Sequence, residues 1–271
     1  LGNRFIGGVS GGGAFPPAID EFFWAVGVNV VEGYGLTETS PVVSVRPFSD
    51  PIMGTVGKPL RGLEAKIVGE NGEILPPGQK GIVMVRGGTV MQGYYKKPEL
   101  TAKVIDKDGW FDTGDIGMLT IDGEIVLRGR MKDTIVLRGG ENVEPLPIEM
   151  KITESRYIAN AVVIGQDERS LGALVILAEE EIKVYARENY IPNNGTYSEL
   201  IQRPENKKLI DSEIAAQVNA KTGFKPFERI CGFAILEKPF EVGVELSAKQ
   251  EIMRYKIADI YAKEIKSIYA E

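Results

Sequence analysis

Residues 129–135 of this chain read Gly-Arg-Met-Lys-Asp-Thr-Ile, and the sequence pattern changes at this stretch. Between 54 and 130, strand-like runs are separated by Asx-Gly dipeptides such as Asp122-Gly123, which favour tight hairpins because these residues tolerate a positive φ. From 131 to 271, helix-like and strand-like segments are mixed. We therefore predict a β-rich subdomain over 54–130, followed by a small α+β domain over 131–271.

A short α/β unit is predicted before residue 54. A glycine-rich stretch is followed by apolar residues at helical spacing from Pro16 to Val26 and by a strand-like run from Val28 to Val31. This order is typical of an α/β unit, and we expect its partner strands upstream of Leu1. Residues 1–53 are thus predicted to end a larger α/β subdomain, and the fold class of the chain is α/β combined with α+β.

Three local predictions concern the second half of the chain. Tyr190 to Asn206 is rich in Pro, Asn and Gly and predicts a loop, whereas Glu251 to Tyr269 predicts a helix. Arg229 to Leu236 predicts a strand, and its Cys231 is interpreted as a buried core thiol. A single cysteine cannot form an internal disulfide, which favours a reducing, cytoplasmic location.

The composition excludes several classes of protein. With 43% hydrophobic and 26% charged residues the chain has the composition of a soluble globular protein, and no apolar run approaches the ~18 residues of a membrane-spanning helix. A net charge of -6 argues against non-specific binding to nucleic acid. Because the chain has no histidine, Ser-His-Asp and Cys-His catalysis and most zinc sites are excluded.

Two clusters have the residue types of a nucleotide site. The first pairs the turn Ser10-Gly11-Gly12-Gly13 with the stretch from Tyr34 to Thr39, in which Tyr34 offers an aromatic face, Thr37 a hydroxyl donor for phosphate and Glu38 an oxygen ligand for Mg²⁺. Taken singly, these residues also suit an ordinary turn and ordinary packing.

The second cluster is the stretch from Gly109 to Gly117. Here a carboxylate after a Thr-Gly turn, Asp115, could accept two hydrogen bonds from a ribose diol. The alternative is an aspartate that only caps the turn.

Three motifs together carry a family resemblance. They are Tyr34-Gly35-x-Thr37-Glu38, Trp110-Phe111-x-Thr113-Gly114-Asp115 and Gly129-Arg130-x-Lys132-Asp133-x-Ile135. In this order and spacing they resemble the AMP-forming acyl-CoA synthetases of the adenylate-forming superfamily. The resemblance covers essentially the whole chain, is closest to the long-chain fatty acid-CoA ligases, and corresponds to their C-terminal portion.

The resemblance implies a role for each matching residue. It makes residues 1–53 the end of a nucleotide-binding subdomain and Lys132 the hinge of a mobile C-terminal domain. It implies that Gly11, Gly12 and Gly13 line the adenine and acyl sites, that Tyr34 stacks on adenine, and that Gly35 belongs to the nucleotide site. It further implies that Thr37 binds the α-phosphate, that Glu38 binds Mg²⁺, that Asp115 binds the ribose hydroxyls and that Arg130 helps to hold the nucleotide. Gly139, Gly140 and Glu141 are implied to enter the site for thioester formation.

The implied reaction has two halves. A carboxylic acid, here a fatty acid by resemblance, attacks ATP to give acyl-AMP and pyrophosphate, and the thiol of coenzyme A then displaces AMP. The C-terminal domain rotates between the two steps. Peripheral membrane contact is compatible with a fatty acid substrate, although no basic amphipathic helix demands it; the sequence leaves the oligomeric state open.

This chain departs from the family pattern in two ways. The phosphate-binding loop expected upstream is absent, so the fragment alone is expected to be inactive. Glu251 stands where the family places a catalytic lysine, and Lys249 is the candidate replacement. A glutamate at this position is also compatible with weak adenylation or with a shifted alignment of this motif.

Two alternative functions are compatible with the sequence. One is an adenylation domain for an aryl or amino acid, because the pocket for the acid lies mostly upstream of this chain. The other is a non-catalytic protein that binds nucleotide or acyl-CoA as a sensor.

Overall fold

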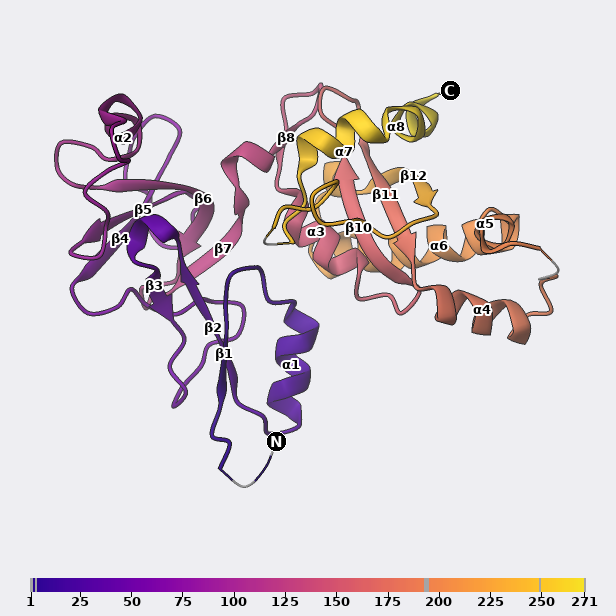
Figure 1. Ribbon diagram of the computed structural model, residues 1–271, viewed down its shortest axis with the longest axis horizontal. Coiled ribbons are helices and arrows are strands. Elements are labelled where there is room, and N and C mark those ends of the chain that lie inside the picture. Colours follow the sequence, from indigo (N-terminus) through magenta and orange to yellow (C-terminus); the bar gives the residue numbers. More distant parts are fainter. Residues whose placement is uncertain (1, 3, 193–194, 249, 271) are drawn as a thin grey trace. The chain divides into compact units, whose positions relative to one another are not determined.

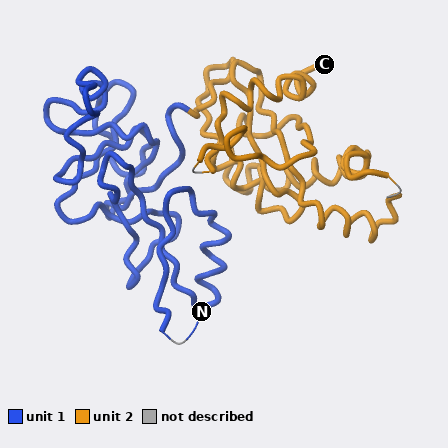
Figure 2. The backbone as a smooth tube through the Cα atoms, in the orientation of Figure 1, with its two compact units in different colours: residues 1–132 blue, residues 133–271 orange. Residues whose placement is uncertain are grey.

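The computed structural model of the protein describes residues 2, 4–192, 195–248 and 250–270 (Figure 1). The chain divides into two compact units, Leu1–Lys132 and Asp133–Glu271 (Figure 2). Each unit combines helices with sheets, which confirms the predicted mixed fold class. Between them lies the short 3₁₀ helix η2 (Met131–Asp133).

The first unit begins with a small mixed sheet of order β1-β2-β3. Strands β1 and β2 are parallel and are connected by α1, whereas β3 is antiparallel to β2. The predicted strand from Val28 is shifted: it begins at Val30 and extends to Gly35, which places Tyr34 on a strand. These elements are β1 (Gly8–Ser10), α1 (Pro17–Ala25), β2 (Val30–Gly35), η1 (Thr37–Thr39) and β3 (Val42–Val45).

A four-stranded antiparallel sheet completes the first unit. Its strands follow chain order, and Gly123, with a φ of 84°, lies in the turn between the last two strands. Valines and isoleucines of this sheet pack with Tyr34 and Val43 in one apolar cluster, which fixes the two sheets against each other. The elements are β4 (Leu63–Val68), β5 (Gly81–Gly87), α2 (Pro98–Val104), β6 (Phe111–Leu119) and β7 (Ile125–Arg130).

The second unit is organised around a sheet of order β10-β11-β12. Its elements are β8 (Ile135–Val136), β9 (Asn142–Val143), α3 (Pro145–Ile152), β10 (Ile158–Ile164), β11 (Leu171–Leu177), α4 (Glu179–Glu188), α5 (Tyr197–Ile201), α6 (Pro204–Gln217), η3 (Ala220–Thr222), η4 (Pro226–Glu228), β12 (Ile230–Leu236), α7 (Arg254–Ile260) and α8 (Ala262–Tyr269).

The central strand β11 is buried along its whole length. Leu171, Ala173 and Val175 pack with residues of α3 to α6 on one face, whereas Leu174 and Ile176 pack with α7 and α8 on the other. A continuous apolar run is what a strand covered on both faces requires. This burial makes the sheet the core of the second unit.

Two predicted segments differ from the structure. The expected loop from Tyr190 contains α5, which is capped because Thr196 accepts a hydrogen bond from the backbone N–H of Glu199 and the Glu199 carboxylate accepts one from Thr196. This capping box is visible in the sequence as Thr-x-x-Glu. The expected helix from Glu251 is two helices that begin only at Arg254, because Ile252 pairs with Leu246 as extended backbone.

The prediction that Cys231 is a core thiol is wrong, because its side chain is exposed. Cys231 lies near the beginning of β12, and burial increases along this strand until Ile235 and Leu236 are covered. Strand β12 is at the edge of its sheet, so an apolar sequence there does not imply cover along the whole strand.

Glycine is required at position 35 because the backbone of Pro41 and Val42 passes close to its Cα. Gly35→Ala is therefore expected to destabilise the first unit. A Cβ at Gly35 would overlap the Pro41 carbonyl and lie 2.9 Å from the Cα of Val42. Such overpacking costs about 1–3 kcal/mol or more. The effect can be measured by urea unfolding followed through tryptophan fluorescence, because both tryptophans, Trp24 and Trp110, belong to this unit.

Gly88→Ala is the matched control for this substitution. A Cβ at Gly88 meets no atom within 4 Å and its φ is not in the left-handed region. If both variants unfold at the same urea concentration, the close approach at Gly35 does not limit stability.

Candidate active site

Asp115, Tyr34 and Arg130 form a polar cluster in the first unit. The Tyr34 hydroxyl donates to Asp115 Oδ2 at 2.6 Å, and Arg130 Nε lies 3.2 Å from Asp115 Oδ1. Asp115 on β6 is paired with Arg130 on β7, while Tyr34 comes from β2 in the other sheet. Asp115 and Tyr34 are buried, but the Arg130 side chain is 41% exposed, so the cluster opens to solvent on the arginine side.

The electrostatics of this cluster favour a protonated Tyr34. Burial raises the pKa of Tyr34 well above its usual value, and the negative charge of Asp115 acts in the same direction. The phenol therefore remains a donor at any physiological pH. Each carboxylate oxygen has a second lone pair, so Asp115 can accept further hydrogen bonds from a ligand.

A local irregularity of β6 orients Asp115. The backbone N–H of Gly114 donates to Asp112 Oδ1 at 2.8 Å, and that of Asp115 donates to the Thr113 hydroxyl at 3.1 Å. The Thr113 hydroxyl itself donates to the Val83 carbonyl, and Gly114 has a φ of 68°. Asp112 therefore caps this turn, which leaves the Asp115 carboxylate available for the cluster.

Thr37 and Glu38 lie on η1, directly after β2. Thr37 is exposed, whereas Glu38 is half-buried and accepts a hydrogen bond from the Tyr94 hydroxyl at 3.1 Å. Burial raises the pKa of Tyr94, as does its hydrogen bond to Glu38. Tyr94 was not among the residues predicted for the site. It lies in the stretch Gly93-Tyr94-Tyr95, which also resembles the AMP-forming acyl-CoA synthetases.

The side chains near Glu38 suit a metal that arrives with a nucleotide. Within the described part of the chain, no group of three or more acidic, cysteine or histidine side chains is arranged to hold an ion. Mg²⁺ commonly binds through one or two carboxylates, with phosphate oxygens and waters as its other ligands. A single carboxylate at Glu38 fits that pattern.

The glycine-rich turn Gly11–Gly13 lies at the end of β1, beside β2. All three glycines are exposed, Gly12 has a φ of 89°, and a Cβ on Gly11 would lie 3.3 Å from the carbonyl oxygen of Gly33. The turn is therefore held close to the residue that precedes Tyr34. This leaves an open backbone surface next to β2.

The remaining predicted residues lie at the boundary or in the second unit. Lys132 is exposed on η2, and Gly139, Gly140 and Glu141 form the turn between β8 and β9, with a φ of 89° at Gly140. Lys249 lies outside the described residues. Glu251 ends a short hairpin turn, where its carbonyl accepts a hydrogen bond from the Ser247 N–H at 2.8 Å.

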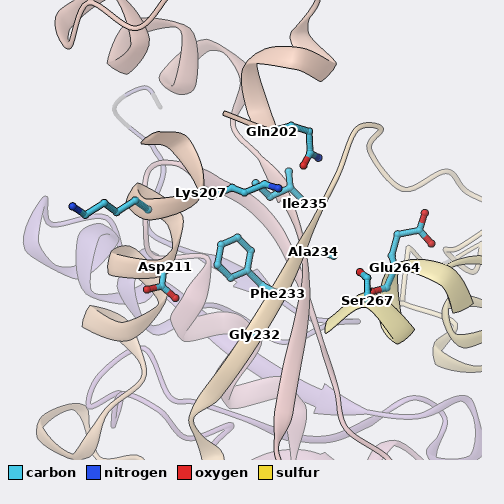
Figure 3. Close-up of a pocket in the computed structure, with 10 residues that line it drawn as sticks. Gln202, Lys207, Asp211, Gly232, Phe233, Ala234, Ile235, Glu264 and Ser267 are labelled. Carbon is cyan, nitrogen blue, oxygen red and sulfur yellow. The ribbon is translucent and has the colours of Figure 1, made fainter. Parts of the chain in front are cut away.

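A cavity of about 620 Å³ lies elsewhere in the second unit, at the β12 edge (Figure 3). Lys207 and Asp211 of α6 line one side of it and Glu264 and Ser267 of α8 another. Its described lining includes none of the residues predicted for the active site. The chemistry of the polar cluster, rather than the size of this cavity, defines the candidate active site.

The chain belongs to the family of AMP-binding enzymes. Residues 3–95 match the AMP-binding enzyme domain, and residues 132–271 match the AMP-binding enzyme C-terminal domain. The family predicted from the three motifs is thereby confirmed. Membership in this family supports ATP or AMP as the nucleotide.

Similar proteins include ligases that act on fatty acids. The chain is 46% identical over 274 residues to the probable acyl-activating enzyme 16, chloroplastic, of Arabidopsis thaliana, covering 97% of this chain and 37% of that protein. It is 40% identical over 275 residues to the long-chain-fatty-acid–[acyl-carrier-protein] ligase AEE15 of the same plant, covering 97% and 36%. It is also 34% identical over 270 residues to the long-chain-fatty-acid–CoA ligase FadD15 of Mycobacterium bovis, covering 99% and 43%.

A solved structure supports the same assignment. The adenylation domain of a carboxylate reductase from Mycobacterium chelonae matches with a TM-score of 0.77 and 26% identity, over 97% of this chain and 38% of that one. The chain therefore spans less than half the length of these related proteins. Among the described residues, no helix is long and apolar enough to cross a membrane.

Proposed function

We propose that this chain is the C-terminal portion of an ATP-dependent ligase that activates a long-chain fatty acid as acyl-AMP and transfers the acyl group to coenzyme A. The observation that carries the proposal is the buried Asp115 carboxylate, held by Tyr34 and flanked by the partly exposed Arg130. In this role Asp115 accepts hydrogen bonds from the ribose hydroxyls, and Arg130 contributes positive charge beside the nucleotide.

The remaining residues of the first unit would act on the phosphates. Thr37, exposed on η1, donates its hydroxyl to the α-phosphate, and Glu38, oriented by Tyr94, binds Mg²⁺. The metal would neutralise charge on the phosphate oxygens. In the second unit, the open turn of Gly139, Gly140 and Glu141 would let the pantetheine arm of coenzyme A approach the backbone during thioester formation.

An exposed apolar face supports the view that this chain is part of a larger enzyme. Helix α1 exposes Phe22 at 58% and Trp24 at 54%. Ile19, 44% exposed, precedes Phe22 by three residues and so shares a face of α1 with it; exposed apolar patches commonly mark sites that contact another protein segment. Since the related ligases are more than twice as long, we propose that the whole activity resides in a longer protein.

We propose one alternative for the acceptor thiol and one for the compartment. One relative at 40% identity is named as a ligase to acyl carrier protein, which favours a carrier-protein thiol as the alternative acceptor. Two plant relatives are named as chloroplastic, so a chloroplast-like compartment is the alternative to the predicted cytoplasm. Contact with a membrane surface would serve delivery of the fatty acid.

The test is ATP–pyrophosphate exchange by the intact enzyme with a panel of long-chain fatty, aryl and amino acids. We expect exchange with the fatty acids and, in a second step, a thioester with coenzyme A or with acyl carrier protein. Exchange with only aryl or amino acids would refute the proposed substrate class. Binding of AMP and acyl-CoA in a calorimeter without any exchange would instead identify a non-catalytic sensor.

A further inference from the structure

An ion pair between a buried glutamate and a partly buried arginine joins the last helices of the second unit to α3. Arg254, the first residue of α7, donates through Nη2 to both carboxylate oxygens of Glu149 at 2.7 Å. Glu149 lies on α3 and is only 6% exposed. The two residues are 105 positions apart in the chain, so this contact fixes the position of α7 against a distant helix.

The same pair is also bonded to the sheet. Arg254 donates through Nη1 to the Val163 carbonyl at 3.1 Å, and the Val163 N–H donates to Glu149 Oε1 at 2.7 Å. Arg254 Nε also lies 3.9 Å from Asp133 Oδ1, at the start of the second unit. Glu149, Arg254 and the two backbone groups of Val163 thus form one closed set of contacts, which we call the clamp.

An ion pair is not the arrangement expected at this position if stability alone is required, because apolar side chains would serve as well. Burial raises the pKa of Glu149, while the charge of Arg254 acts in the opposite direction. Buried ion pairs can often be replaced by apolar side chains without loss of stability, and in some proteins they serve instead to specify one geometry. The clamp therefore points to a position that must be held accurately.

The clamp holds the base of the hairpin that directly precedes Arg254. Leu246 pairs with Ile252, the Ser247 N–H donates to the Glu251 carbonyl, and the Met253 N–H donates to the Glu245 carbonyl at 2.8 Å. The Glu245 carboxylate accepts a hydrogen bond from the Tyr261 hydroxyl of the segment that follows α7. This hairpin, described over residues 245–248 and 250–253 and called the 245–253 hairpin below, includes Glu251.

We propose that Arg254 and Glu149 are positioning residues for acyl-adenylate formation, because their clamp holds the base of the 245–253 hairpin against α3 and β10. The inference rests on the proposed function. Thioester formation is assigned to a different hairpin, the turn of Gly139 to Glu141, so loss of the clamp should slow the first half-reaction selectively.

The test compares the two half-reactions in the intact enzyme. Arg254→Met is expected to lower kcat for ATP–pyrophosphate exchange with a long-chain fatty acid by about 10- to 100-fold, since misplacement of a catalytic segment by ~1 Å has effects of this size. The KM for ATP should change little. Thioester formation from chemically prepared acyl-adenylate and coenzyme A should stay within about 2-fold of wild type, because its hairpin is not held by Arg254.

A second variant separates positioning from folding. In the double variant Glu149→Met, Arg254→Met the buried charges are removed together, so its thermal stability should return toward wild type while exchange remains slow. Arg254→Lys, which keeps the charge but loses the bidentate contact, should recover part of the exchange rate.

Three results would overturn the inference. Equal losses in both half-reactions would mean a merely structural role, and wild-type exchange in the double variant would mean that the clamp positions nothing. Absence of exchange in the wild-type intact enzyme would refute the proposed function and the clamp's role with it. The first two results leave the proposed function intact.

Discussion

Replacing Lys249 with alanine in the intact enzyme is expected to slow acyl-adenylate formation by about 10² to 10³, the usual effect of removing one group that stabilises transition-state charge. Negative charge accumulates on the attacking carboxylate and the α-phosphate in this step. Glu251 occupies the position of the family lysine and would repel that charge. Lys249 precedes Glu251 by two residues, which makes it the nearest cation along the sequence.

The measurement is pyrophosphate release, and Glu251→Lys provides the decisive companion variant. Placed in the Lys249→Ala background, Glu251→Lys should restore the rate by returning a cation to the family position. Lys266→Ala, on α8, is the control for loss of a lysine as such. Unchanged pyrophosphate release in Lys249→Ala would exclude the proposed role.

Asp115→Asn is expected to raise the KM for ATP by about 10- to 100-fold, because hydrogen bonds to a charged group contribute roughly 1.5–3 kcal/mol. The substitution keeps the size of the side chain but removes the negative charge that faces Arg130. The amide also carries hydrogen atoms on one of the two positions that would accept from the ribose. ATP-dependent exchange kinetics and calorimetry with AMP both report the loss.

Tyr34→Phe is the matched control for Asp115→Asn. It removes only the hydroxyl that donates to Asp115 and leaves the carboxylate beside Arg130. We expect a smaller effect on AMP affinity than for Asp115→Asn. Wild-type AMP affinity in Asp115→Asn would contradict a ribose contact at this residue.

Much of the fold could be predicted from local patterns in the sequence. The helix expected from Pro16 to Val26 forms from Pro17 to Ala25, and the turn at Asp122-Gly123 forms the predicted hairpin between β6 and β7. The strand expected from Arg229 to Leu236 forms from Ile230 to Leu236. These features depend on short-range backbone preferences, which the sequence carries directly.

The contacts that organise the candidate site depend on distant residues. Tyr34 and Asp115 are 81 positions apart, and their hydrogen bond has no local signature in the chain. The same holds for Arg254 and Glu149. The error at Cys231 has the same origin, because whether an apolar strand is central or at an edge depends on its neighbours in the sheet.

The hydrogen bond between Tyr34 and Asp115 would couple nucleotide binding to the stability of the first unit. It connects the mixed sheet to the antiparallel sheet of the first unit, so a nucleotide that engages Asp115 binds only when the two sheets are packed together. Ligand binding to the folded form alone raises its stability by mass action. Raising the nucleotide concentration would therefore raise the melting temperature of the first unit.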